Sequence, residues 1–75
     1  MIPAMVTLDA ARGATPHALQ MLLKSHPEVS GVGVTRRGRG WALKVNLTRR
    51  PRRPLPKEID GVPVVEEIVG RVSAQ

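Results

Sequence analysis

A strict alternation of side chains over residues 41–48 constrains the fold more than any other feature of the sequence. Every second residue is apolar, and the set is Trp41, Leu43, Val45 and Leu47. The residues between them are small or polar, and they are Ala42, Lys44, Asn46 and Thr48. Because successive side chains of a β-strand point to opposite faces, the pattern predicts a strand with one buried face.

A second strand is predicted from Val29 to Arg36, with Val32 and Val34 on one face and Gly31 and Gly33 on the other. Since glycine has no side chain to pack, two glycines on one face predict a close approach by another backbone or a helix. The glycine-containing run 37–40 is typical of a hairpin turn. The two strands are therefore expected to pair antiparallel, with their apolar faces on the same side.

The clearest helix start is Thr15-Pro16, because threonine caps helices and proline at the first helical position wastes no donor. Pro27 disfavours helical geometry in the preceding residue, so the helix should end near Ser25. The side chains predicted to share its apolar face are Ala18, Leu19, Leu22 and Leu23.

The C-terminal half contains a basic, proline-rich segment at residues 49–57, which predicts an extended loop. Asp60-Gly61 is typical of a turn, and Val62 to Val72 is predicted to be a last strand. Pro63 places the start of that strand at an edge, and Glu66-Glu67 disturbs the alternation enough to indicate a bulge.

These elements predict an α+β fold, a small two-layer sandwich with one helix on a three- or four-stranded, mostly antiparallel sheet. If residues 4–8 form a strand, the order is β-α-β-β-β, a reduced ferredoxin-like arrangement, and we favour this version. If they form a helix or a loose arm, the sheet has three strands. Residues 1–75 are expected to be a single domain with a loose tail at 73–75.

The small size of the chain limits its stability, since such chains bury only roughly 60 % of their unfolded surface. There is no cysteine, and His17 and His26 have no clustered acidic ligands around them. We therefore expect no metal and no cofactor, and a homodimer is the natural means of completing the core. No segment has the character of a membrane span or a signal peptide, so a cytoplasmic location is expected.

No combination of residues predicts an enzyme. None of Ser25, Ser30 and Ser73 lies in the Gly-x-Ser-x-Gly turn of a hydrolase nucleophile. The run Gly31-Val32-Gly33-Val34 lies within a predicted strand, whereas phosphate-binding glycine loops open a helix. Glu66 and Glu67 are adjacent in a predicted strand and so point to opposite faces. The sequence therefore predicts a binding protein without catalytic activity.

Two arginine clusters are the strongest functional signal in a chain of net charge +6. The candidate binding residues are Arg36, Arg37, Arg39, Arg49, Arg50, Arg52, Arg53 and Trp41. Arginine suits bidentate contacts to phosphates and carboxylates, although arginine richness is also typical of GC-rich genomes and thermophiles. A strand over the eight residues 41–48 would hold the clusters on the order of 25 Å apart. Trp41 can stack a base or belong to the core.

Three short stretches carry a family resemblance, at residues 31–34, at 43–47 and at 55–64 from Leu55-Pro56 to Asp60-Gly61-Val62-Pro63-Val64. They resemble the non-catalytic segment that precedes the protease-like domain in some bacterial trypsin-related proteins. The resemblance covers residues 27–70 and implies a fold but no activity and no functional residue. The strand order is also similar to that of small heavy-metal-associated domains, whose paired cysteines are absent here.

The leading hypothesis is a nucleic-acid-binding or ribonucleoprotein-associated protein that contacts phosphates of DNA or RNA through arginine. An acidic protein surface would satisfy the same side chains. The alternative is a protein-interaction or structural domain that docks through an edge strand or a sheet face.

Overall fold

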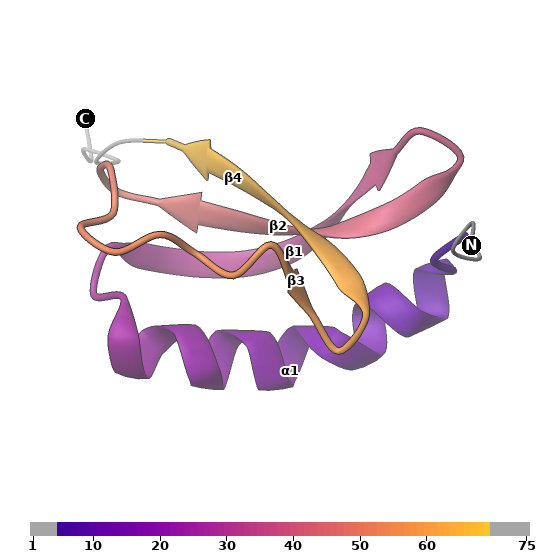
Figure 1. Cartoon of the computed structure of the whole chain (residues 1–75), viewed down its shortest axis with the longest axis horizontal. Helices are drawn as coiled ribbons and strands as arrows, with labels where there is room; N and C mark the ends of the chain where they lie inside the picture. Colours follow the sequence, from indigo (N-terminus) through magenta and orange to yellow (C-terminus); the bar gives the residue numbers. More distant parts are fainter. Residues whose placement is uncertain (1–4, 70–75) are drawn as a thin grey trace, which may run out of the picture.

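The computed structural model describes residues 5–69, which form one helix against one face of a four-stranded sheet (Figure 1). The elements are α1 (Leu8–Ser25), β1 (Val29–Arg37), β2 (Gly40–Leu47), β3 (Glu58–Ile59) and β4 (Val62–Ile68). This arrangement confirms the predicted α+β two-layer fold. The predicted tail at 73–75 lies outside the described residues.

The sheet is mixed and has the strand order β1-β2-β4-β3. β1 and β2 form the predicted antiparallel hairpin, β2 and β4 are parallel, and β3 and β4 are antiparallel. Parallel neighbours need a crossover connection. Residues 48–57 supply it by returning along the sheet from the end of β2 to the start of β3 (Figure 1).

The predicted apolar face of the hairpin is confirmed by its register, in which Val32 lies opposite Val45 and Val34 lies opposite Leu43. The buried core cluster joins this face to α1, the crossover and the β3–β4 hairpin. Its members are Ala11, Ala14, Ala18, Leu22, Val29, Leu43, Val45, Leu47, Leu55, Ile59 and Val62.

The helix begins eight residues before the predicted Thr15-Pro16 start. Thr7 is the N-cap, and its hydroxyl accepts a hydrogen bond of 3.1 Å from the Ala10 amide. Pro16 lies inside the helix, where its missing N–H normally weakens helices. The Thr15 hydroxyl donates to the Ala11 carbonyl at 3.0 Å, so this threonine binds within the helix instead of capping it. The predicted end at Ser25 is confirmed.

The buried stripe of α1 consists mainly of alanine and runs through Ala11, Ala14, Ala18 and Leu22. Leu19 packs at its margin, but Leu23 is 52 % exposed, so its predicted place on the apolar face is wrong. The start of the helix at Leu8 brings Ala11 and Ala14 onto the sheet. Their small side chains let the helix face the sheet closely, which rotates Leu23 away from it.

The predicted strand over residues 4–8 is not present in the described part of this segment, because residues 5–7 have no regular structure and Leu8 begins α1. One backbone hydrogen bond, from the Trp41 amide to the Val6 carbonyl at 3.0 Å, ties the segment to β2. The element order is therefore α-β-β-β-β, and β3 supplies the fourth strand. Residues 58–59 lie between the predicted loop and the predicted turn and belong to no predicted element, since two residues carry too short a pattern.

The predicted turn at Asp60-Gly61 closes the β3–β4 hairpin. Both residues have positive φ, 54° and 78°, as a tight two-residue hairpin turn requires. β4 ends at Ile68, whereas the predicted last strand ends at Val72. The described residues end at Val69. Its register against β2 is regular through Glu66 and Glu67, so the bulge expected there is absent; a register shift occurs in β1 between Val29 and Gly31.

The extended loop predicted at 49–57 is confirmed, and two contacts hold it against the rest of the chain. Leu55 is buried in the core cluster. His26 is buried. Its Nε2 lies 3.3 Å from the Pro54 carbonyl oxygen, and its Nδ1 lies 2.8 Å from the Ser25 hydroxyl. Because a carbonyl only accepts, Nε2 donates in the first bond. His26 therefore links the end of α1 to the basic loop.

The glycine face of β1 is open, which corrects the expected close approach at Gly31 and Gly33. A Cβ atom added at either position would meet nothing within 4 Å, whereas one at Gly40 would lie 3.1 Å from the Val6 nitrogen and 3.2 Å from its oxygen. The helix packs on the valine face instead.

Gly33→Val is accordingly expected to stabilise the protein by about 0.5–1 kcal/mol, because valine is less flexible than glycine and favours strands. Gly40→Val is expected to cost about 1–3 kcal/mol through its clash with the Val6 backbone. Urea denaturation of both variants measures the difference. A loss of stability in Gly33→Val would mean that its face is covered.

Candidate nucleic-acid interface

Within residues 5–69, no acidic side chain forms an ion pair with an arginine. In the described part of the chain, the Asp60 carboxylate contacts the His17 ring and Glu67 forms an ion pair with Lys44, each at 3.0 Å, and neither contact uses an arginine. Glu28 is 2 % exposed and lies within the fold. Positive charge is therefore concentrated on guanidinium groups that have no acidic partner within residues 5–69.

The first group of arginines, called here the hairpin cluster, comprises Arg36, Arg37 and Arg39 at the β1–β2 turn. All three are exposed. Arg36 lies on the helix side, with its guanidinium carbon 5.3 Å from the centre of the Trp41 ring. Arg37 lies on the other side of the sheet because adjacent strand residues alternate. The cluster therefore presents cations on both faces of the hairpin.

Trp41 is half-buried and packs against the core cluster. Its predicted place in the core is confirmed, while Arg36 lies over its ring and part of its surface stays accessible. Its backbone also anchors Val6.

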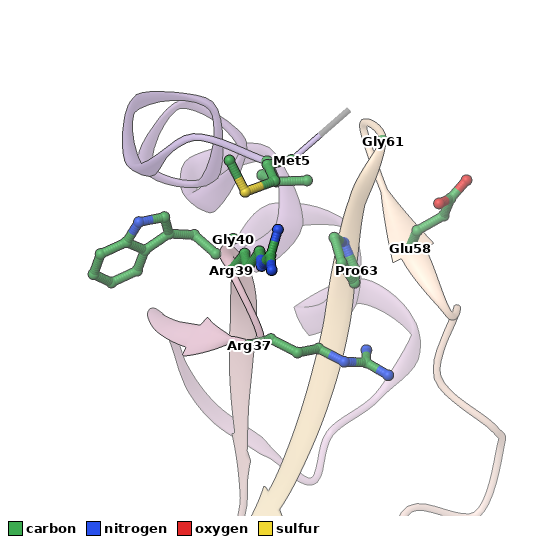
Figure 2. A pocket seen from close by; sticks show the side chains of 9 residues that line it. Met5, Arg37, Arg39, Gly40, Glu58, Gly61 and Pro63 are labelled. Carbon is green, nitrogen blue, oxygen red and sulfur yellow. The ribbon is translucent and has the colours of Figure 1, made fainter. Parts of the chain in front are cut away.

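A pocket of about 300 Å³ opens beside the hairpin cluster, and it is called here the splay pocket. Its lining residues are Met5, Val6, Arg37, Arg39, Gly40, Trp41, Glu58, Gly61 and Pro63. Figure 2 shows Arg37 and Arg39 reaching it from the hairpin, with Gly61 and Pro63 on the opposite side and Met5 between them. The Glu58 carboxylate points away from the other labelled side chains (Figure 2).

The pocket exists because β2 and β4 separate at their first residues. Their pairing begins only at Leu43 and Val64. In the continued register the amide of residue 63 would donate to the Trp41 carbonyl, but Pro63 has no N–H. The carbonyl of Trp41 is thus directed toward β4 without a donor from that strand, and the segment around Val6 occupies only part of the gap.

The second group, called here the loop cluster, comprises Arg49, Arg50, Arg52 and Arg53, all exposed in the crossover. Arg52 and Arg53 line an open hollow of about 270 Å³ with Lys24, Ser25, Pro27 and Glu28. The end of α1 therefore adds Lys24 to this basic surface. The buried Glu28, which also lines the hollow, offsets part of the positive charge of this surface.

The two clusters lie at opposite ends of β2, as the sequence predicts, and the structure does not bring them into one site. Sequence reasoning missed Met5, Val6, Pro63 and Lys24. Pro63 carried a signal, because a proline early in a strand marks a place where a ladder bond is absent. The others are adjacent to the arginines only through tertiary packing.

Among residues 5–69, no group of three or more histidine, cysteine, aspartate or glutamate side chains is placed to hold a metal. The Ser25 hydroxyl contacts His26 and the Met21 carbonyl, and the Ser30 hydroxyl donates to the Asn46 carbonyl. Both are structural contacts. Within the same part of the chain, no helix is long and apolar enough to span a bilayer.

No protein-family model, no curated protein and no solved structure matches the chain. The resemblance to the segment of trypsin-related proteins therefore stays a prediction.

Proposed function

We propose that this protein is a non-enzymatic nucleic-acid-binding module that contacts backbone phosphates through arginine. One observation carries the proposal: within residues 5–69 the arginines of both clusters are exposed and none is paired with an acid. Guanidinium groups in this state are matched to phosphate oxygens, which they bind bidentately.

The spacing of the clusters supports an extended footprint. β2 has eight residues, so its ends lie on the order of 25 Å apart at ~3.4 Å per residue. Phosphates along one DNA strand rise by about 3.4 Å each, so this span corresponds to roughly seven nucleotides. The two clusters would then hold separate phosphates on either side of a stretch of that length.

Binding should depend steeply on salt, because phosphate contacts release counterions. We expect a slope of log K against log salt of about −3 to −5, with weak sequence preference, since contacts to phosphates carry no base information. Fluorescence anisotropy with labelled duplex DNA, single-stranded DNA and RNA over a range of salt measures it. Failure to bind any of the three more tightly than about 100 μM at physiological salt would exclude this function.

Self-association through β1 is the second candidate. The last strand, whose start is predicted to lie at an edge, is β4 and lies between β2 and β3, so β1 is considered instead. β1 is an outer strand of the sheet, and its residues 29–35 carry no charge. His17 contacts Asp60 of the β3–β4 turn, so the side of α1 that carries His17 lies next to that turn. At 3.6 residues per turn, the opposite flank carries Leu19 and Leu23, which places both on the side of β1.

Two copies can therefore pair antiparallel along β1 and bring their leucine flanks together. Neighbouring strands are about 4.8 Å apart. Because α1 contacts both β1 and β2, helices centred between these strands in the two copies would lie about 10 Å apart, a normal helix-packing distance. The antiparallel arrangement also separates the arginine ends of the two strands. Charge of the same sign on both copies opposes the dimer, so salt should strengthen it while weakening nucleic-acid binding.

We expect a dimer in the micromolar range at about 0.5 M salt, and Leu23→Gln should dissociate it without lowering fold stability. Sedimentation equilibrium measures the association. Hydrogen exchange at Val32 and Val34, whose amides point away from β2, should slow as the dimer forms. A single 8.1 kDa species at the highest attainable concentration would contradict this candidate.

A further inference from the structure

We propose that the splay pocket receives one unpaired nucleotide, so that the protein prefers single-stranded nucleic acid over duplex. This inference rests on the proposed function and adds the form of the ligand. It uses features that phosphate contacts alone do not need, namely a recess of about 300 Å³, apolar lining residues and a backbone carbonyl that receives no donor from β4.

The size of the pocket suits a single base. Its volume is about 300 Å³, at the lower end of the range of small-molecule sites. Met5, Val6 and Pro63 provide apolar surface for the faces of a planar ring. A base that leaves its stack loses apolar contacts, and such a lining replaces them.

The polar groups around the pocket match the rest of a nucleotide. Arg37 and Arg39 have only donors, so they suit a phosphate or the carbonyl oxygens of a base. The Trp41 carbonyl, which Pro63 cannot satisfy, is an acceptor for an amino or imino group of the base. Donors and an acceptor around one small pocket fit the edge of a base better than they fit a bare anion.

The preference for single-stranded nucleic acid follows from how easily a base can enter the pocket. A base in a duplex presents only its groove edges, and entry into a pocket requires it to be unstacked at a cost of a few kcal/mol. Bases of single strands are already available for insertion. The pocket lies beside the hairpin cluster, so an inserted nucleotide would have its flanking phosphates near exposed guanidinium groups.

The first experiment separates base contacts from phosphate contacts. A ten-nucleotide single strand, an all-abasic strand of equal length and charge, and a duplex of the same sequence are titrated at one salt concentration. We expect the abasic strand to bind about tenfold more weakly than the normal strand. Amide resonances of Gly40, Gly61 and Val6 should shift with the normal strand, and the fluorescence of Trp41, the only tryptophan, should change.

Nucleoside 5′-monophosphates, compared with ribose 5-phosphate, distinguish a free nucleotide from a nucleotide within a strand. If the monophosphates shift the resonances of Gly40 and Gly61 and ribose 5-phosphate does not, the pocket recognises the base without the rest of the nucleic-acid strand. If only the ten-nucleotide strand produces them, the neighbouring phosphates are required. Both results support the pocket as a base site.

Two variants of equal charge provide the control. Arg37→Gln with Arg39→Gln removes the donors of the pocket, and Arg49→Gln with Arg50→Gln removes two charges at the other end of β2. We expect only the first to abolish the roughly tenfold advantage of the normal strand over the abasic strand. Both should weaken strand binding, and all these side chains are exposed, so the fold should persist.

The outcomes separate this inference from the proposed function. If the normal and abasic strands bind equally and the pocket resonances do not move, the base site is wrong, while nucleic-acid binding stands. If no strand or duplex binds more tightly than about 100 μM, both are wrong. Tighter binding to the duplex than to the single strand would also overturn the base site.

Discussion

Leu43→Ala is expected to destabilise the protein by about 2–5 kcal/mol, because the truncation leaves a cavity that rigid neighbours cannot fill. Leu43 is 0 % exposed. It lies opposite Val34 of β1 on one side and opposite Val64 of β4 on the other. Domains have only about 0.05–0.15 kcal/mol of stability per residue, so a chain this short should lose much of its folded population.

The matched control is Leu23→Ala, which removes the same atoms from a side chain that is 52 % exposed. Its effect is expected to stay within about 0.5 kcal/mol, since little surface is uncovered. Urea denaturation followed by circular dichroism compares the two, at low protein concentration to avoid association. Equal losses would mean that Leu23 is covered and that the helix is rotated from the position described.

Replacing Arg49, Arg50, Arg52 and Arg53 with serine is expected to weaken nucleic-acid binding about 100-fold near physiological salt. Each phosphate contact that is lost removes roughly 0.7 from the salt slope on a single strand. We therefore expect the slope to become less negative by about 2 to 3. Affinity titrations of the wild type and the variant at several salt concentrations give both quantities.

The fold should survive this change, because the loop is held by Leu55 and His26, and the four arginines are exposed. A double variant, Arg12→Ser with Lys57→Ser, serves as the control for charge outside the clusters. It should lower affinity less than Arg49→Ser with Arg50→Ser, which has the same net charge. Equal losses in the two double variants would show that net charge alone, and not the loop cluster, attracts the ligand.

Local patterns in the sequence determined the β-hairpin and the class of fold. The alternation over residues 41–48 and the turn at Gly38 specify β1, β2 and their shared apolar face, because the period of a strand is two residues and needs no distant partner to define it. Pro27 determined the end of α1, and Asp60-Gly61 determined the last turn, through backbone restrictions that are local as well.

Tertiary packing decided where α1 begins. Thr15-Pro16 is a good local start, yet the helix continues upstream to Thr7 because Ala11 and Ala14 bury their side chains against the sheet. The free energy gained by packing these alanines exceeds the cost of a proline inside the helix. Local helix propensity does not include this packing energy, so it could not predict the start. The same packing turned Leu23 outward and left Gly33 uncovered.

The candidate site divides in the same way. The sequence by itself determined that two arginine clusters flank β2, because a strand holds its ends apart at a known rise per residue. Only the tertiary structure decided that β4 pairs parallel with β2, and that Pro63 and Trp41 line one pocket with Met5 and Val6. Strand pairing between distant segments is set by the whole core, so a pocket formed where two strands separate has no local signature.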